Sequence, residues 1–476
     1  MVFADLFFLY FFLPLCLMCY FITRKPAIRN AVLVVFSLIF YAWGEPVWVS
    51  ILIVSSLVDY INGLIIDKYR GKAPAKAALI WSLVFNLGVL MGFKYTGFFV
   101  ENLNSMAGLH IPVPHIKLPI GISFFTFQTI SYTVDCYRNK VKTQRSFGKF
   151  LMYVSMFPQL VAGPIVRYSV ISDEIEDRRT SIKDFSEGCS RLILGVAKKV
   201  IIANNLSTMV TALFGDDKNG FANINSQSVL GTWLGAVLTG LWIYYDFSGY
   251  SDIAIGLGRI FGFHFDENFR YPYICNSITE FWRRWHISLS TWFRDYVYIP
   301  LGGNRKGKAR QCLNLLIVWS LTGFWHGASW NFMIWGAYFG VLLILEKFLY
   351  GKVLEKSPAV LKHLYAVILV AVGWGIFYFE DLGQLGKFFK SLVGANSNKL
   401  TDYYVGHLFM GNLWLILAAV IFATPLIPKL KEKAWKSDSG AYAMQTLGIV
   451  CNAALLLVSS ILLVNTTNNP FLYFRF

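Results

Sequence analysis

Charged side chains are scarce in this sequence of 476 residues, because Asp, Glu, Lys and Arg make up only 15% of it. Soluble domains carry roughly a quarter of such residues. Apolar residues account for 56%, and the mean hydropathy is +0.51. A water-soluble globule could not cover that much apolar surface with so few charges. Intrinsic disorder is excluded for the opposite reason, since disordered chains have low hydrophobicity.

Acidic residues are the scarcer charged class, with 27 Asp and Glu against 43 Lys and Arg, for a formal charge of +16. In a soluble protein this excess would suggest a nucleic-acid partner. Here the basic residues gather in alternate short connections between apolar runs, at 24–29, 68–76, 138–149 and 429–436. This is the positive-inside pattern. It predicts a multi-pass protein in contact with membrane lipid, with both termini extracytoplasmic and with no nucleic-acid partner.

Several motifs of soluble enzymes and metalloproteins are also missing. The sequence has no Walker loop, no Gly-x-Gly-x-x-Gly, no Gly-x-Ser-x-Gly and no His-Glu-x-x-His, so ATP-driven, serine-hydrolase and metal-dependent activities have no support. The seven cysteines are scattered, and the only close pair, Cys16 and Cys19, lies inside an apolar run. We therefore predict no disulfide framework and no metal site.

Apolar runs of membrane-spanning length recur along the whole chain. A bilayer span needs about 20 residues of helix, so we expect roughly 10–13 spans. The predicted fold is all-α and polytopic, with re-entrant and interfacial helices around a central chamber. Residues 1–476 are expected to form a single domain, in which 441–476 is a final span and an extracytoplasmic aromatic tail. The clearest runs are 2–22, 31–43, 47–66, 77–99, 119–137, 150–166, 229–244, 312–325, 366–379, 411–427 and 444–464.

Two of these runs contain helix-breaking sequences, at 119–124 and 159–167. Non-helical backbone at membrane depth is tolerated only where it lines a cavity or is buried in protein. We interpret both stretches as walls of the chamber, and the alternative is a plain interfacial turn.

Polar residues enter the apolar sequence as one block between 241 and 330, and such residues are functional candidates by default. His326 directly follows the apolar run 313–325, and Gly323 and Gly327 beside it would let a ligand approach closely. A neutral imidazole there can take a proton from a hydroxyl and return it. His326 is therefore the candidate general base, and the alternative is a histidine hydrogen-bonded between helices for packing.

His286 lies earlier in the same block. Large apolar residues recur around it at helical spacing, which predicts an amphipathic helix at the membrane interface, with basic side chains that bind lipid phosphates. The functional alternative is the mouth of a site for a phosphate-rich donor, lined by cations. The apolar residues are Phe281, Trp285, Leu289 and Trp292. The candidate donor-binding cations are Arg283, Arg284, Arg294, Arg305 and Lys306.

The sequences FWRRWHISLSTWFRDY at 281–296 and GFWHG at 323–327 resemble the membrane-bound O-acyltransferase family. His326 follows His286 by 40 residues, which is similar to the family's spacing between a polar helper residue and the catalytic histidine. The His at the first position resembles the bacterial polysaccharide branch, which O-acetylates alginate and peptidoglycan, rather than eukaryotic members with Asn. LGGNR at 301–305 argues against the shorter D-alanyl transferases of teichoic acid. Further segments that resemble the branch are 41–46, 121–128, 159–164 and 299–305.

The resemblance implies an enzyme of the bacterial cell membrane, an O-acyltransferase that acts on hydroxyl groups. It would move an acetyl group from a cytoplasmic thioester donor across the membrane for O-acetylation of a cell-surface polysaccharide. Acetyl-CoA or an acyl carrier would be the donor, with no cofactor bound permanently, and an extracytoplasmic acetyltransferase of serine-hydrolase-like fold would be a partner. His326 would act as general base, while His286 and the arginines would orient the donor and offset its charge. The alternatives are D-alanyl transfer to teichoic acid and a non-catalytic transporter or assembly subunit.

The C-terminal sequence NPFLYFRF at 469–476 resembles the tyrosine-bearing end of the small single-span partner in the D-alanylation system, as if that partner were fused here. We hypothesise that this tail folds back into an outward-facing funnel, where Tyr473 accepts the acyl group as a transient ester. The alternative is an aromatic anchor at the membrane interface.

Overall fold

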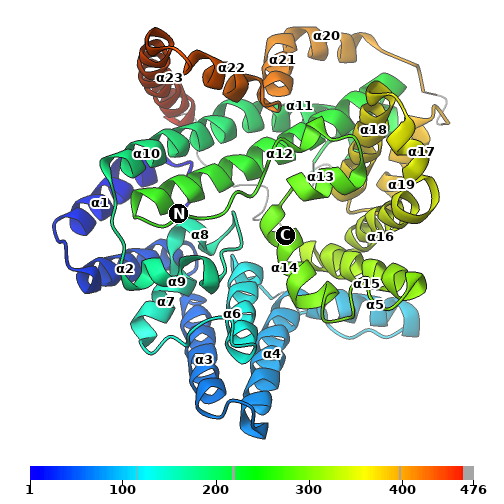
Figure 1. The fold of residues 1–476 in the computed structure, drawn as a ribbon. Helices are drawn as coiled ribbons and strands as arrows, with labels where there is room; N and C mark the ends of the chain where they lie inside the picture. The colour runs from blue at the N-terminus through cyan, green and yellow to red at the C-terminus, as the bar shows by residue number, and fades with distance from the viewer. Residues whose placement is uncertain (115, 217–219, 396–397, 465–476) are drawn as a thin grey trace. The chain divides into compact units, whose positions relative to one another are not determined.

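The computed structural model describes residues 1–114, 116–216, 220–395 and 398–464. Every regular element within these ranges is a helix, which confirms the all-α prediction (Figure 1). Tyr473 and the rest of the C-terminal tail lie outside the described residues. The chain divides into two compact units, one formed mainly by Met1–Ile193 with Tyr250–Glu267 and the other by Leu194–Gly249 with Asn268–Leu462.

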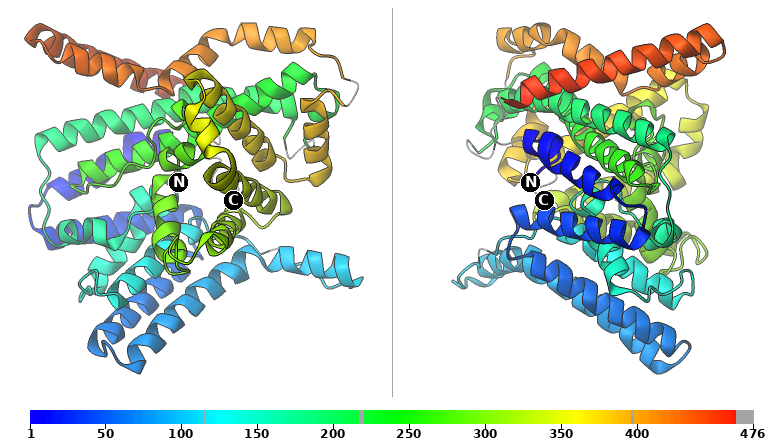
Figure 2. Two further views of the ribbon diagram at one scale, coloured as in Figure 1. Left: turned by 45° about the vertical axis from the view of Figure 1, so that its right-hand side comes forward. Right: turned by 90° about the vertical axis from the view of Figure 1, so that its left-hand side faces the viewer.

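In the first unit, α3 (Val49–Lys68) packs against α4 (Ala73–Lys94) and α6 (Ile122–Tyr137), and α3 and α4 lie side by side at the blue end of the chain (Figure 1, Figure 2). A buried polar cluster joins the three helices. The Asp59 carboxylate accepts hydrogen bonds from Ser82 Oγ at 2.5 Å and Asn86 Nδ2 at 2.7 Å, and Ser82 Oγ lies 3.0 Å from Thr133 Oγ1. Each of these four buried side chains therefore has a hydrogen-bond partner within the cluster.

The helix-breaking stretches predicted at 119–124 and 159–167 lie together in the first unit. The expected span 150–166 is divided at Met156 into α7 (Phe147–Ser155) and α8 (Phe157–Leu160), and residues 161–166 continue as buried non-helical backbone. Gly121 has a φ of +79°, and a side chain there would come within 2.7 Å of the Leu160 carbonyl oxygen. Both stretches are therefore packed inside protein rather than exposed as interfacial turns.

Seven helices within the described residues are long and apolar enough to cross a membrane. The count becomes eight if the bent pair α20 (Tyr403–Gly411) and α21 (Leu413–Phe422) is taken as one span. The polytopic fold is confirmed, with fewer spans of full length than the 10–13 expected. The seven are α2 (Pro26–Gly44), α3, α4, Ile182–Phe214, Trp330–Lys356, α18 (Ala359–Tyr378) and α23 (Asp438–Val464).

Two of these spans, Ile182–Phe214 and Trp330–Lys356, were not expected from the sequence, since lysines interrupt the first and the second continues into a basic end. The first contains α10 (Ile182–Ala197), the π-helical turn η2 (Lys198–Ala203) and α11 (Asn204–Phe214). The second contains α16 (Trp330–Leu345), the π-helical turn η7 (Glu346–Tyr350) and α17 (Gly351–Lys356).

The second unit holds most of the polar block, namely residues 241–249 and 268–330. Its elements are the first part of α12 (Val229–Ile260), α13 (Ile278–Arg284), α14 (Ile287–Phe293), the π-helical turn η6 (Arg294–Tyr298), α15 (Lys308–His326), α16, α18 and α19 (Leu382–Leu392). α15 and α16 pack closely as a pair.

The remaining helices of the two units are η1 (Phe8–Phe12), α1 (Leu13–Phe21), α5 (Thr96–Ala107), α9 (Tyr168–Glu176), η4 (Ala222–Ser226), η5 (Pro272–Ile274) and α22 (Leu426–Ala434).

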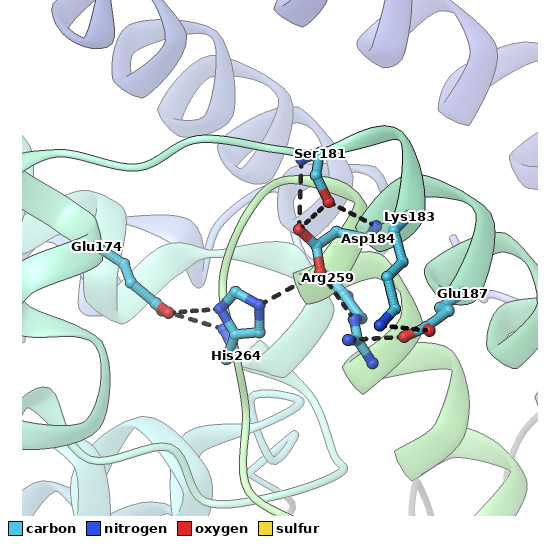
Figure 3. Close-up of polar contacts among 7 residues, drawn as sticks. All are labelled: Glu174, Ser181, Lys183, Asp184, Glu187, Arg259 and His264. Carbon is cyan, nitrogen blue, oxygen red and sulfur yellow. Dashed lines mark hydrogen bonds and ion pairs between the residues drawn. The ribbon is translucent and has the colours of Figure 1, made fainter.

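An ion-pair cluster at the surface of the first unit joins the ends of three helices (Figure 3). His264 Nδ1 lies 2.6 Å from Glu174 Oε1 of α9, and its Nε2 lies 3.7 Å from Asp184 Oδ1 of α10. Arg259 of α12 donates to Asp184 at 3.2 Å and pairs with Glu187 at 2.7 Å. His264 is half exposed, and both of its ring nitrogens lie in surface ion pairs.

Candidate active site

Two histidines of the polar block lie buried in the second unit, with His286 2% exposed and His326 8% exposed. Trp325 contacts both of them. Its ring centroid lies 6.2 Å from that of His286 and 4.9 Å from that of His326. The structure therefore brings together two residues that are 40 positions apart in the sequence, through one shared indole ring.

The helix before His286 is fixed at its start by side chains of its own sequence. Ser277 Oγ accepts a hydrogen bond from the backbone N–H of Glu280 at 3.0 Å, and Glu280 Oε2 accepts one from Asn276 N at 2.9 Å. This arrangement resembles a capping box, except that Glu280 accepts from the residue before the N-cap. α13 ends after seven residues at Arg284.

The sequence pattern predicted one continuous amphipathic helix at the membrane interface, and this prediction is wrong in two respects. The helix is interrupted at His286, whose φ of +43° and ψ of +55° are left-handed. In addition, the stripe is buried in protein, with the Phe281 ring stacked on Trp285 at 5.5 Å and Trp285 4.7 Å from Trp374 of α18. The interruption and the burial place His286 inside the second unit rather than on an exposed helix face.

A left-handed backbone costs a non-glycine residue roughly 1–2 kcal/mol, and such strain persists only where the surroundings impose it. At His286 the surroundings include a neighbouring loop segment. The backbone N–H of Ile287 donates to the Asn268 carbonyl at 3.0 Å, and His286 Nδ1 lies 3.1 Å from Asn268 Oδ1. Asn268 therefore holds the histidine through its side chain and through the backbone of the next residue at once.

The other ring nitrogen of His286 has a different environment. His286 Nε2 is buried and has no hydrogen-bond partner within the part of the chain that the structure describes. Phe247 of α12 packs edge-on against the ring, with centroids 4.7 Å apart. Burial lowers the pKa of the His286 imidazole below its usual range, so the ring is neutral and has a lone pair to offer.

His326 is the last residue of α15 and lies among aromatic rings. The ring of Trp335 lies 5.1 Å away and that of Phe377 5.3 Å away, centroid to centroid. The glycines beside it have a different role from the one expected. A side chain at Gly323 or Gly327 would overlap Phe332 of α16. These glycines therefore admit the neighbouring helix rather than a ligand.

Glu346 was missed by the sequence analysis, although an acidic residue in the apolar run that begins at 330 is a signal by the same rule that selected His326. Its carboxylate is 5% exposed and accepts hydrogen bonds from Ile278 N at 2.6 Å, Thr279 N at 2.9 Å and Thr279 Oγ1 at 2.6 Å. Tyr365 OH donates to it at 3.0 Å. Glu346, in η7 after α16, thus holds the start of α13.

A second feature missed from the sequence is a buried ion pair. Lys199 Nζ lies 2.6 Å from Asp246 Oδ1, and the two side chains are 4% and 2% exposed. Lys199 belongs to the π-helical turn η2, a distortion that frequently accompanies functional sites. Asp246 directly precedes Phe247, the residue that packs on His286. The pair joins α12 to η2 at the residue before Phe247.

The four candidate arginines differ in their partners. Arg284 pairs with Glu280 at 2.8 Å and Arg294 with Asp295 at 2.7 Å. Arg283 and Arg305 are exposed, and neither guanidinium group has a hydrogen-bond or ion-pair partner among the described residues. The last two are therefore the cations of the set that are available to bind an anionic ligand.

Comparison with known proteins identifies the family. Residues 122–382, which include both histidines and all four arginines, match the membrane-bound O-acyltransferase family. The chain is 37% identical to "Probable alginate O-acetylase AlgI" of Azotobacter vinelandii over the full length of both chains. It is 31% identical to "Peptidoglycan O-acetyltransferase" of Helicobacter pylori, over 98% of this chain and 96% of that protein. It is 28% identical to "Teichoic acid D-alanyltransferase" of Bacillus subtilis, over 50% of this chain and 61% of that protein.

The family match covers more than half of the chain, and the similarity to the first relative covers all of it. The chain belongs to the membrane-bound O-acyltransferase family, and it is a multi-pass membrane enzyme that transfers acyl groups.

Proposed function

We propose that this enzyme takes an acetyl group from a cytoplasmic thioester donor, acetyl-CoA, and passes it across the membrane for O-acetylation of a cell-surface polysaccharide. Full-length similarity to proteins named as O-acetylases of alginate and peptidoglycan supports the acetyl group and the polysaccharide. The observation that carries the chemistry is the pair of buried histidines that share Trp325.

His326 is the general base of the proposed reaction. As the hydroxyl oxygen of the acceptor attacks the thioester carbonyl, the imidazole takes the hydroxyl proton. The new C–O bond forms, the C–S bond breaks, and the proton returns to the departing thiolate. The aromatic surroundings of His326 keep water away from this step, which strengthens the electrostatic interactions within it.

The cationic side chains bind the donor in this account. Acetyl-CoA carries phosphate groups that guanidinium groups bind through paired hydrogen bonds. Arg283 and Arg305 supply the main contacts, because neither guanidinium group has another partner among the described residues. Arg284 and Arg294 contribute less, since carboxylates already hold them.

The remaining parts of the proposal concern the surroundings of the enzyme. It lies in a bacterial cell membrane with both termini extracytoplasmic, as the basic loops predict. Its two compact units form one acyltransferase domain, since the family match at 122–382 includes residues of both. An extracytoplasmic acetyltransferase of serine-hydrolase-like fold completes the transfer to polysaccharide, and Tyr473 serves as the transient acyl carrier.

The similarity to a teichoic acid D-alanyltransferase favours one second candidate, D-alanyl transfer. It is weaker because it covers half of the chain, whereas the O-acetylase similarity covers all of it. A transporter or a non-catalytic assembly subunit is set aside, because the family consists of acyltransferases.

The test is acyl transfer in membranes from cells that express the enzyme. Membranes receive acetyl-CoA or a D-alanyl carrier protein, each radiolabelled in the acyl group, and alkali-labile radioactivity in glycan is counted. We expect label from acetyl-CoA only. Label from the D-alanyl carrier alone would replace the proposal with its alternative.

A second experiment tests the carrier role of Tyr473. Membranes receive acetyl-CoA, the acyl-enzyme is trapped, and its intact mass is measured, with acetyl on Tyr473 as the expected result. Full activity of Tyr473→Phe would refute the carrier role.

A further inference from the structure

The hydrogen bonds around His286 determine which of its nitrogens carries the proton. Asn268 Oδ1 lies 3.3 Å from the backbone nitrogen of Ser288, 2.9 Å from Ser288 Oγ and 3.1 Å from His286 Nδ1. A backbone N–H can only donate, so the atom of the Asn268 side chain at this point is the amide oxygen. An amide oxygen can only accept, and His286 Nδ1 must therefore carry the hydrogen that it donates to Asn268.

The position of Asn268 is itself fixed by two backbone hydrogen bonds. The segment 268–270 runs beside 284–287, where Arg270 N donates to the Arg284 carbonyl at 2.9 Å and Ile287 N donates to the Asn268 carbonyl at 3.0 Å. Asn268 is fully buried. Its oxygen is consequently shielded from solvent and holds Nδ1 of the His286 ring.

With the proton on Nδ1, the Nε2 of His286 has a lone pair and no hydrogen. This nitrogen is buried without a partner in the described residues, and a buried acceptor left unsatisfied costs about 1–3 kcal/mol. A substrate group that binds there must donate a hydrogen bond. The thioester carbonyl and the donor phosphates are acceptors, so they do not fit this nitrogen, whereas the hydroxyl of the acyl acceptor does.

We propose that Asn268 is a positioning residue that fixes His286 in the Nδ1-protonated form, so that His286 Nε2 accepts a hydrogen bond from the hydroxyl that receives the acyl group. This inference rests on the proposed function and changes the part assigned to His286. The residue orients the acceptor rather than the donor, and His326 takes the proton as the reaction proceeds.

The side chains that contact the His286 ring carry no charge near neutral pH. A charge introduced at position 268 should therefore change the protonation state of the ring. Phe247, Trp325, Asn268 and Ser288 contact or adjoin it, and none of them ionises near neutral pH. The ionisable groups on the elements around it include Asp246 with its partner Lys199, Arg270 on the segment of Asn268, Glu280, Arg283 and Arg284 on α13, Arg294 after α14, and His326 on α15. Burial is the cause of the lowered pKa of His286.

Asn268→Asp is the decisive variant, because Asp keeps the shape and the acceptor oxygens but adds a negative charge. A carboxylate at this distance favours the imidazolium and raises the pKa of His286 by roughly one to three units. The charged ring has a proton on Nε2 and cannot accept from a hydroxyl. Activity of this variant should therefore fall as the pH decreases through the raised pKa and recover at higher pH, whereas the wild type shows no such acid limb from His286.

The assay measures label transfer from radiolabelled acetyl-CoA to endogenous glycan acceptor in membranes, between pH 4 and 9, with enzyme quantified by immunoblot. Asn268→Leu should lower kcat at every pH by at least 10-fold, without a new acid limb and with an unchanged KM for acetyl-CoA. Asn104→Asp, a surface change in α5 whose Oδ1 accepts from Ile111 N at 2.9 Å, is the matched control and should behave as wild type.

The outcomes separate the inference from the proposed function. If the wild type transfers no acetyl group from acetyl-CoA, the proposed function fails. If the wild type is active and Asn268→Asp has the same pH profile, the inference about His286 is wrong. An Asn268→Leu enzyme with normal kcat and a raised KM for acetyl-CoA would also overturn it, because that result would assign His286 to the donor.

Discussion

The ring of Trp325 lies 6.2 Å from the ring of His286, although the two residues belong to different helical segments of the second unit. Because Trp325 also adjoins His326 at 4.9 Å, a single side chain contacts both histidines. Their relative placement therefore depends on the packing of aromatic rings more than on direct hydrogen bonds between them.

Truncation of this indole should disorder the pair. Trp325→Ala removes a buried ring, and such changes cost about 3–5 kcal/mol. We expect acetyl transfer to fall at least 10-fold per folded enzyme, while Trp325→Phe retains a larger share. The measurement is label transfer normalised to the monodisperse fraction in size-exclusion chromatography. Trp330→Ala, which alters a half-exposed residue at the start of α16, is the control, and equal losses in both variants would contradict the prediction.

Glu346 should contribute to stability and activity together. Glu346→Ala leaves the N–H groups of Ile278 and Thr279 without their acceptor, and each buried unsatisfied donor costs about 1–3 kcal/mol. We expect a lower thermal midpoint in detergent and a loss of activity in the fraction that remains folded, with partial recovery in Glu346→Gln. Asp381→Ala, which removes the side-chain cap of α19 at the surface, is the control. It should cause little loss of activity per folded enzyme. Full activity of Glu346→Ala would show that the start of α13 needs no such anchor.

Lys199 and Asp246 form a buried ion pair, so we expect the effects of replacing them on stability to be non-additive. Removal of one partner leaves a buried charge, which typically costs about 3–5 kcal/mol, whereas replacement of both by apolar residues is often neutral. We expect Lys199→Met and Asp246→Leu each to reduce folded enzyme strongly and the double variant to restore it. Thermal unfolding of the three purified variants measures this, and additive losses would contradict it.

The two arginines without partners should act on donor binding alone. Arg283→Ala and Arg305→Ala each remove a charged contact to phosphate, and each should raise the KM for acetyl-CoA several-fold with little change in kcat. The effect should shrink as salt is raised, because salt screens exposed charges. Lys183→Ala, at an exposed residue of the first unit, is the matched control. A fall in kcat with an unchanged KM would assign these arginines another role.

Much of the account could be predicted from the sequence, and the exceptions have physical causes. The charge-poor composition gave the helical membrane fold, and His326 stood out because it ends an apolar run. The break at His286 was hidden because Phe281 and Leu289 lie on one apolar stripe on both sides of it, and both are buried. The partner that stabilises the buried Lys199, Asp246, lies 47 residues further along the chain, so no local pattern reveals it.

The most direct test of the account is the acetate content of cell-surface polysaccharide when His326 is replaced. A deletion strain is complemented with wild type, His326→Ala or His264→Ala, and acetate released by mild alkali is measured per unit of glycan, with enzyme levels matched by immunoblot. Loss of a general base typically costs about 10²–10⁴-fold in rate. The account predicts glycan without detectable acetate for His326→Ala and wild-type acetate for His264→Ala. Undiminished acetate in the His326→Ala strain would contradict it.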